Sequence, residues 1–170
     1  NAVNLPVSDP ADLPRLQPYL ILAERLGLLL HALESGACDA MTLELGGQTH
    51  SESRLICAAA LKGLLAPQTD TPITLVNAAP FAAERHITVA VVDASAQADS
   101  DARIGIEMKL GKRSRRAEGT VENGSALRIS RIDEFPLDIV PQGRVLIFSN
   151  KDRPGVIGAV GAVLGGAKIN

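Results

Sequence analysis

Basic side chains gather in one short stretch about two thirds of the way along the chain. Five of the eight residues from 109 to 116 carry a positive charge: Lys109, Lys112, Arg113, Arg115 and Arg116. Guanidinium groups that converge on one point bind phosphate through paired hydrogen bonds. The pattern therefore predicts an anion site formed by Lys112, Arg113, Arg115 and Arg116 around a hairpin turn. A basic turn that is merely solvated is the alternative interpretation.

A glycine-rich stretch near the end of the chain is the second candidate for phosphate chemistry. A dinucleotide-binding loop needs two glycines one residue apart, whereas Gly155, Gly158 and Gly161 are three apart. No Gly-Lys-Ser/Thr follows them, so a Walker loop is excluded as well. Glycines at this spacing lie along one face of a helix. The stretch predicts a strand at Val145–Phe148, a polar loop, a helix, and a second strand beginning at Lys168.

Composition excludes several other classes of function. The 170 residues carry a net charge of −2, with one Tyr, three Phe and no Trp, which argues against a nucleic-acid surface. The most apolar run, Tyr19–Leu33, is short and interrupted by charged side chains, so a membrane role is not expected. Cys38 and Cys57 lack ligand spacing, which favours small buried residues in a reduced, cytoplasmic chain with no metal.

The elements that would position these residues follow from hydrophobic periodicity. The first half of the chain predicts two long helices, three strands and a short helix opened by Pro80. The long helices are Pro18–Leu33 and Leu55–Gly63, and the strands are Met41–Leu45, Ile73–Asn77 and Ile87–Val92.

The second half of the chain changes to the two-residue period of β-hairpins. Apolar and polar residues alternate over Arg103–Leu110, and Arg116–Val121 returns after a turn. Asn123-Gly124 predicts a two-residue turn before Leu127–Ile132, and prolines flank one more extended segment at 136–141. The predicted fold class is α+β, with two long helices and a mixed or antiparallel sheet.

The end of the chain resembles the opening of an ACT domain, a βαββαβ module that binds amino acids. The resemblance rests on Asp152–Gly158 and, after the helix, on Gly166–Asn170. Four further motifs resemble, in order, the long form of the D-3-phosphoglycerate dehydrogenase family, and together they span essentially the whole chain. They are Asn1–Pro6, Leu16–Gly27, Ala60–Leu65 and Leu75–Ala78. One departure is His86, which stands where the family commonly has a glycine-like turn.

The resemblance implies a domain organisation and an activity for the whole enzyme. It implies a linker from a catalytic domain at 1–14, an intervening allosteric substrate-binding domain at 15–142, and the first part of a truncated ACT domain at 143–170. The enzyme would oxidise 3-phosphoglycerate to 3-phosphohydroxypyruvate with NAD, the first step of L-serine biosynthesis. These 170 residues would contain no catalytic residue and no cofactor site, because the family's catalytic His, Glu and Arg have no match here.

The resemblance also implies partners and effectors. Asn150, Asp152 and Asn170 match the positions that hold the feedback inhibitor L-serine, although Asp152 as a helix cap and Asn150 as a turn residue are the alternative. Phosphorylated hydroxy acids would bind the basic hairpin, and the enzyme would be a homodimer or homotetramer.

Two other functions stay open from the sequence. One is the regulatory region of an iron–sulfur L-serine dehydratase, whose intervening domain is related. The other is a stand-alone amino-acid-binding module. The opening motif Asn1–Asn4 favours the dehydrogenase, because it resembles the exit from that catalytic domain.

Overall fold

The computed structural model describes residues 13–34, 36–46, 52–94, 102–149 and 153–169. Four α-helices and six strands are present in this part of the chain. In chain order they are α1 (Leu13–Leu33), β1 (Ala40–Leu45), α2 (Ser53–Leu65), the 3-10 turn η3 (Ala66–Gln68), α3 (Ala78–Glu84), β2 (Thr88–Asp93), β3 (Ala102–Leu110), β4 (Arg113–Glu122), β5 (Ala126–Ile132), β6 (Phe135–Ile139) and α4 (Val156–Gly166).

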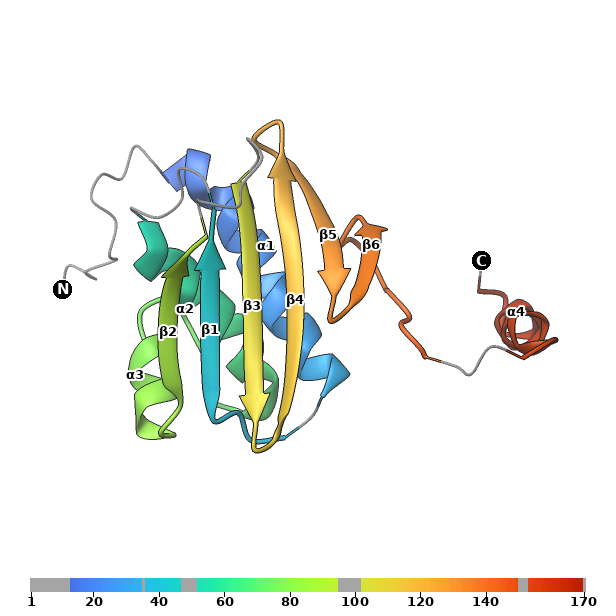
Figure 1. Ribbon diagram of the computed structural model, residues 1–170, viewed down its shortest axis with the longest axis horizontal. Coiled ribbons are helices and arrows are strands. Elements are labelled where there is room, and N and C mark those ends of the chain that lie inside the picture. The colour runs from blue at the N-terminus through green and yellow to red at the C-terminus, as the bar shows by residue number, and fades with distance from the viewer. Residues whose placement is uncertain (1–12, 35, 47–51, 95–101, 150–152, 170) are drawn as a thin grey trace.

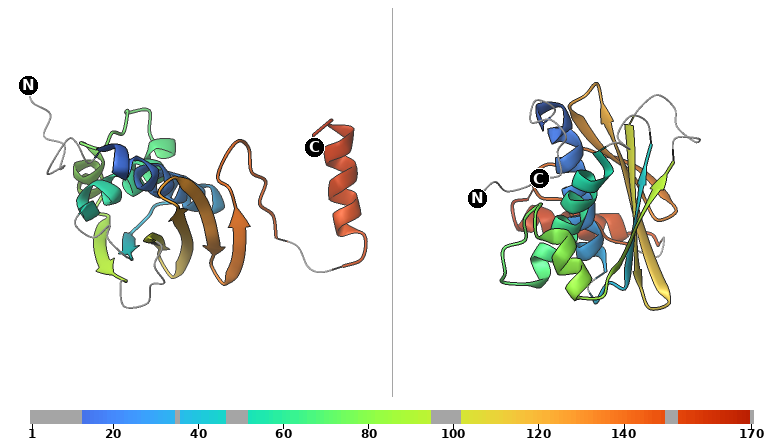
Figure 2. Two further views of the ribbon diagram at one scale, coloured as in Figure 1. Left: turned by 90° about the horizontal axis from the view of Figure 1, so that it is seen from above. Right: turned by 90° about the vertical axis from the view of Figure 1, so that its left-hand side faces the viewer.

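The six strands form one mixed sheet in the order β2-β1-β3-β4-β5-β6 (Figure 1). Strands β3 to β6 are a meander in which each strand is antiparallel to the next. Strand β1 is antiparallel to β3 and parallel to β2, and α2 and α3 lie in the connection between the parallel pair. Helices α1, α2 and α3 cover one face of the sheet, and the other face is open (Figure 2). The predicted α+β class with a mixed sheet is confirmed.

The core lies between this helix layer and the covered face of the sheet. Alternate residues of β1 and β3, among them Leu43, Leu45 and Ile106, are fully buried against leucines of α1 and α2. The two helices touch through their backbones, since a Cβ added at Gly27 would lie 2.2 Å from the Ala60 carbonyl oxygen. Glycine is needed here because any side chain would push the helices apart.

Most predicted elements are confirmed, but the strand predicted at Ile73–Asn77 is wrong. Residues 75–77 form a turn that leads into α3. The Asn77 side-chain oxygen accepts hydrogen bonds from the Thr74 backbone N–H at 2.7 Å and from its hydroxyl at 3.1 Å. The Asn77 amide donates to the Pro72 carbonyl at 2.9 Å. These local bonds satisfy the backbone in place of a sheet ladder.

Two other boundaries differ from the predicted ones. Helix α1 begins at Leu13 rather than at Pro18, so a proline lies inside the helix after one turn and a half. The Asn123-Gly124 turn is confirmed by positive φ angles of 49° and 74°, but the loop has three residues because β5 begins at Ala126.

The segment after β6 lies apart from the sheet and its helices (Figures 1 and 2). Its start is held to α1, where the Arg25 guanidinium donates to the Pro141 carbonyl oxygen. The predicted strands at Val145–Phe148 and from Lys168 are absent from the described residues, and the first of them is an irregular segment that pairs with no strand. Helix α4 is confirmed, with no buried residue. A strand requires a neighbour, and none of the described strands lies beside 145–148.

Candidate functional site

The basic stretch forms the hairpin between β3 and β4, as predicted. Leu110 pairs with Arg113, which leaves Gly111 and Lys112 as the turn. Gly111 has a φ of +59°, a conformation that glycine adopts at little cost. Its backbone N–H donates to the Asp39 carboxylate at 2.5 Å, which ties the turn to the start of β1. The tip of the hairpin is therefore anchored.

The two cations at the tip are the most available to a ligand. The Lys112 side chain is exposed, and no ion pair to it is found among the described residues. Arg113 is 66% exposed and pairs through Nη1 with Glu34 Oε1 at 2.5 Å, just beyond the end of α1. That single bond leaves most of the guanidinium donors of Arg113 directed to solvent.

The side chains of Arg115 and Arg116 make more contacts within the protein than those of Lys112 and Arg113. Arg115 Nη1 lies 3.0 Å from Asp133 Oδ2, and its buried Nε has no hydrogen-bond partner within the described ranges. Arg116 places both Nη atoms 2.5 Å from the two carboxylate oxygens of Glu44, and its Nε 2.8 Å from Glu118 Oε1. Its backbone N–H donates to Asp133 at 2.9 Å. All three guanidinium nitrogens of Arg116 are therefore occupied.

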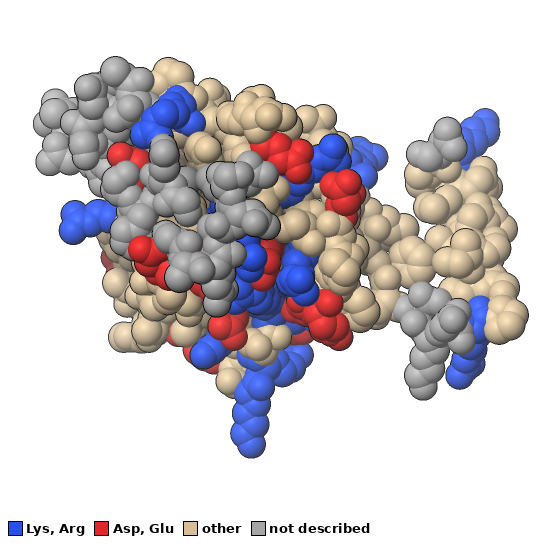
Figure 3. Space-filling view, turned by 45° about the horizontal axis from the view of Figure 1, so that its top comes forward, with Lys and Arg blue, Asp and Glu red and all other residues tan. Residues whose placement is uncertain are grey.

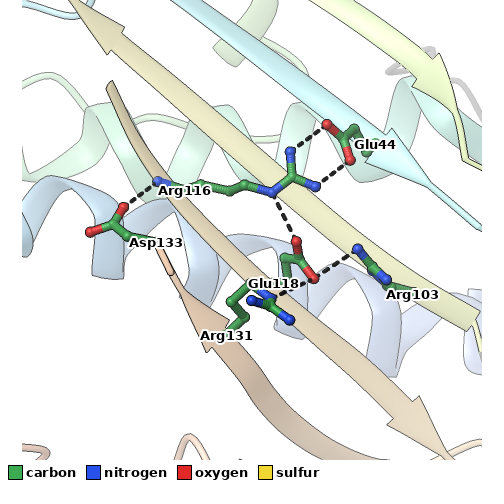
Figure 4. A network of polar contacts seen from close by, with 6 residues as sticks. All are labelled: Glu44, Arg103, Arg116, Glu118, Arg131 and Asp133. Carbon is green, nitrogen blue, oxygen red and sulfur yellow. Dashed lines mark hydrogen bonds and ion pairs between the residues drawn. The ribbon is translucent and has the colours of Figure 1, made fainter. Parts of the chain in front are cut away.

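A larger network surrounds Arg116 on the open face of the sheet (Figure 4). Its centre is Glu118, which is only 5% exposed. Arg103 Nη2 lies 2.8 Å from Glu118 Oε2, and Arg131 Nε lies 3.7 Å from the same oxygen. A carboxylate with so little solvent requires this compensation, because an unpaired buried charge is costly. The network thus connects β1, β3, β4 and β5 through side-chain ion pairs.

Glu44 shows the electrostatic effect of this network on a titrating group. The bidentate hydrogen bonds from Arg116 lower the pKa of the Glu44 carboxyl below its usual value, with a smaller opposing effect of burial and further lowering by the charges of Arg116 and Arg103. The same hydrogen bonds raise the pKa of the Arg116 guanidinium above its already high value. Both groups are charged throughout the physiological range of pH.

The four residues of the predicted anion site lie on different parts of the hairpin. Arg113 and Arg115 share the helix-covered face of β4, Arg116 lies on the open face, and Lys112 is at the tip. Figure 3 shows acidic side chains interspersed with the basic ones on the face in view. Sequence reasoning missed the carboxylates that pair with these arginines. The alternating polar residues of 103–109 and 114–122 nevertheless indicate that one face of the sheet is polar and open to solvent. The pairing itself depends on strand register.

The burial predicted for the two cysteines is confirmed. Cys38 and Cys57 are free and buried. Burial raises the pKa of the Cys57 thiol to about 11 and also raises that of Cys38. Neither is suited to act as a nucleophile at neutral pH.

The last part of the chain holds the predicted serine site and the glycine-rich segment. Asn150, Asp152 and Asn170, the predicted serine-binding residues, lie outside the described part of the chain. The glycine-rich stretch does not form a dinucleotide-binding loop, since Gly155 is its only glycine with a positive φ and Gly158 and Gly161 lie within the helix. No group of three metal-ligating side chains, and no helix long and apolar enough to cross a membrane, occurs among the described residues.

Comparison with known proteins identifies the family. Residues 15–133 match the family described as the D-3-phosphoglycerate dehydrogenase intervening domain. Over 100% of its length, the chain is 33% identical to a D-3-phosphoglycerate dehydrogenase of Synechocystis, 32% to one of Archaeoglobus fulgidus and 34% to one of Methanocaldococcus jannaschii. It covers 31%, 32% and 32% of those proteins, so it spans about a third of the length of these relatives. The chain therefore belongs to the D-3-phosphoglycerate dehydrogenase intervening domain family.

Proposed function

We propose that this chain is the regulatory region of a D-3-phosphoglycerate dehydrogenase. The observation that carries the proposal is the family match over residues 15–133, together with relatives of that name that align with the whole chain over a third of their own length. The rest of the enzyme would supply the catalytic groups and bind NAD, and would oxidise 3-phosphoglycerate to 3-phosphohydroxypyruvate at the start of L-serine biosynthesis. The names of these relatives favour the dehydrogenase over an iron–sulfur L-serine dehydratase.

In this proposal residues 15–142 are the allosteric domain and residues 143–170 begin an ACT domain. The exposed apolar side chains after residue 143 support this division. Leu146 is 64% exposed and Ile157 is 74% exposed, as expected of residues whose packing partners lie in further elements of such a domain. L-Serine would bind at Asn150, Asp152 and Asn170, and the assembled enzyme would be a homo-oligomer.

The basic hairpin would bind phosphorylated hydroxy acids. Lys112 and Arg113 would make the first contacts, since their donors face solvent, and Arg115 would add a third cation from the same face as Arg113. Arg116 would hold the hairpin in place through Glu44 and Glu118 rather than touch the ligand. An exposed site of this kind binds weakly, and salt should weaken it further.

Two measurements test the proposal at separate levels. The enzyme that contains this chain should reduce NAD in the presence of 3-phosphoglycerate, and the absorbance of NADH measures this reaction. An inactive enzyme would refute the assignment. The hairpin is tested by calorimetric titration of the 170-residue chain with 3-phosphoglycerate. Replacing Lys112 and Arg113 together by Ala should weaken binding about two- to thirtyfold, from roughly 0.2–1 kcal/mol per exposed contact.

A matched control removes the same charge elsewhere. Arg54 and Arg144 are exposed, so replacing both by Ala changes the net charge equally but leaves the hairpin intact. Equal loss of affinity in this control, or no loss in the hairpin variant, would reject the hairpin as the anion site. The assignment of the enzyme would stand in either case.

A further inference from the structure

Strand β2 forms one edge of the sheet, and no described strand lies beyond it. All six of its residues are exposed, including Val89 at 38%, Val91 at 40% and Val92 at 46%. Edge strands are usually protected by charged side chains, proline or a bulge. Residues Thr88–Val92 contain none of these, and β2 pairs with β1 in unbroken register. The opposite edge, β6, carries Pro136 and a register shift.

The backbone of β2 presents regularly spaced hydrogen-bonding groups at this edge. In a parallel pair, alternate residues direct both their N–H and C=O to the same neighbour. The Thr88 N–H donates to the Asp39 carbonyl at 2.9 Å, and the Ala94 N–H donates to the Leu45 carbonyl at 2.8 Å. The even-numbered residues therefore bond to β1. Val89 and Val91 direct their N–H and C=O away from the sheet.

We propose that β2 pairs with β2 of a second copy of this chain, antiparallel, about a two-fold axis through Ala90. This pairing would be one of the contacts within the proposed homo-oligomer, and to that extent the inference rests on the proposed function. Val89 of one copy would lie opposite Val91 of the other and exchange both backbone hydrogen bonds with it. Ala90 would lie opposite Ala90, and Thr88 opposite Val92. The two sheets would become one, with both helix layers on the same face.

Charge favours a second copy as the occupant, and it also favours this register. Thr88–Val92 is uncharged, so no like charges meet across the axis. The nearest charges at the two ends of the strand have opposite signs, Arg85 before it and Asp93 at its end. Antiparallel pairing places Asp93 of one copy opposite residue 87 of the other, at the end that carries Arg85. Moving the axis to Val91 would set Asp93 against a valine instead.

Cysteine cross-linking tests both the contact and its register. In a non-hydrogen-bonded antiparallel pair the Cα atoms are about 4.5 Å apart, within the range of a disulfide. Ala90→Cys should therefore give a covalent dimer under mild oxidation, seen on a non-reducing gel. Thr88→Cys is the matched control, because two copies of residue 88 would lie about 13 Å apart, four residues along the strand. The native cysteines, Cys38 and Cys57, are buried.

A mixture of Thr88→Cys and Val92→Cys chains provides a second readout should Ala90→Cys fold poorly. These two positions face each other in the proposed register, so the mixed dimer should form and the Thr88→Cys homodimer should not. Equal cross-linking of Ala90→Cys and Thr88→Cys, or no cross-linking of either Ala90→Cys or the mixture, would overturn the proposal.

A charge at the edge should abolish the contact. Val91→Lys, added to Ala90→Cys, should lower the cross-linking yield at least tenfold. Ile157→Lys is the control, since it also replaces an exposed apolar residue by lysine, but in α4 and away from β2. Cross-linking that survives Val91→Lys, or is lost equally with Ile157→Lys, would place the contact elsewhere and refute the edge pairing. NADH formation by the whole enzyme tests the proposed function independently of these results.

Discussion

Replacing Gly27 by Ala should separate α1 from α2 and destabilise the domain. The new Cβ would lie 2.2 Å from the Ala60 carbonyl oxygen and 2.9 Å from the Leu64 backbone nitrogen. The first contact is about 1.2 Å shorter than the 3.4 Å at which ordinary van der Waals contact begins. Both obstructing atoms belong to the backbone, so no side-chain rotation relieves the overlap. The helices must therefore move apart by about that amount.

The expected cost is the difference between two effects. Overpacking of a core costs about 1–3 kcal/mol, and a clash with a rigid helix backbone belongs at the upper end. Alanine is favoured over glycine inside a helix by about 1 kcal/mol, which offsets part of that cost. The net loss is about 2 kcal/mol, and in a domain of this size it corresponds to a decrease in Tm of about 8 °C.

Thermal unfolding followed by circular dichroism measures this decrease. Gly161→Ala is the control, because its added Cβ in α4 meets nothing within 4 Å and its Tm should not fall. Gly63→Ala should behave like Gly27→Ala, since its Cβ would clash with the Glu24 carbonyl oxygen of the facing helix. A Gly27→Ala variant as stable as the parent would show that the two helix backbones are not in contact.

Two further predictions concern an ion pair and a strained residue. Because the pKa of Glu44 is lowered in the folded state, its contribution to stability is present above its ordinary value near 4.5 and is lost as pH falls through the folded value. Glu44→Gln should therefore be less stable than the parent at pH 7, and the difference should shrink in urea unfolding at pH 3. His86 has a φ of +59°, so His86→Gly should raise the stability by roughly 0.5–1 kcal/mol, and His86→Ala should not.

Hairpins and helices were predictable because their signals are local. The alternation over 103–110 is the burial pattern of β3, in which Ile104, Ile106 and Met108 face the core. The strand prediction at residues 73–77 is wrong because Leu75 and Val76 next to Thr74 resemble a strand. In the structure the Asn77 side chain closes a turn there. A side chain that competes for backbone hydrogen bonds leaves little trace in hydrophobic periodicity.

The candidate site was less predictable than the fold. The cluster of basic residues is visible in the sequence, and the strand period predicts its division between two faces of the sheet. The strand period does not predict which carboxylates pair with these residues. Glu44 and Arg116 are separated by 72 residues, and they meet only because β3 places β1 and β4 two strands apart. The register shift between Glu118 and Gly119 further changes which β5 residues lie near the network. Charge pairing across strands is decided by topology.

The order of strands in the sheet also governs the sequence of events during synthesis. The meander β3–β6 joins neighbours in the chain, so its loops close quickly. Strand β1 leaves the ribosome earlier, yet both of its sheet neighbours follow at least 40 residues later. Helix α1 must likewise wait for β4, against which it packs. Helices α1 and α2 can pack on each other early, but their sheet-facing leucines stay uncovered until the hairpins emerge, which leaves apolar surface exposed in that interval.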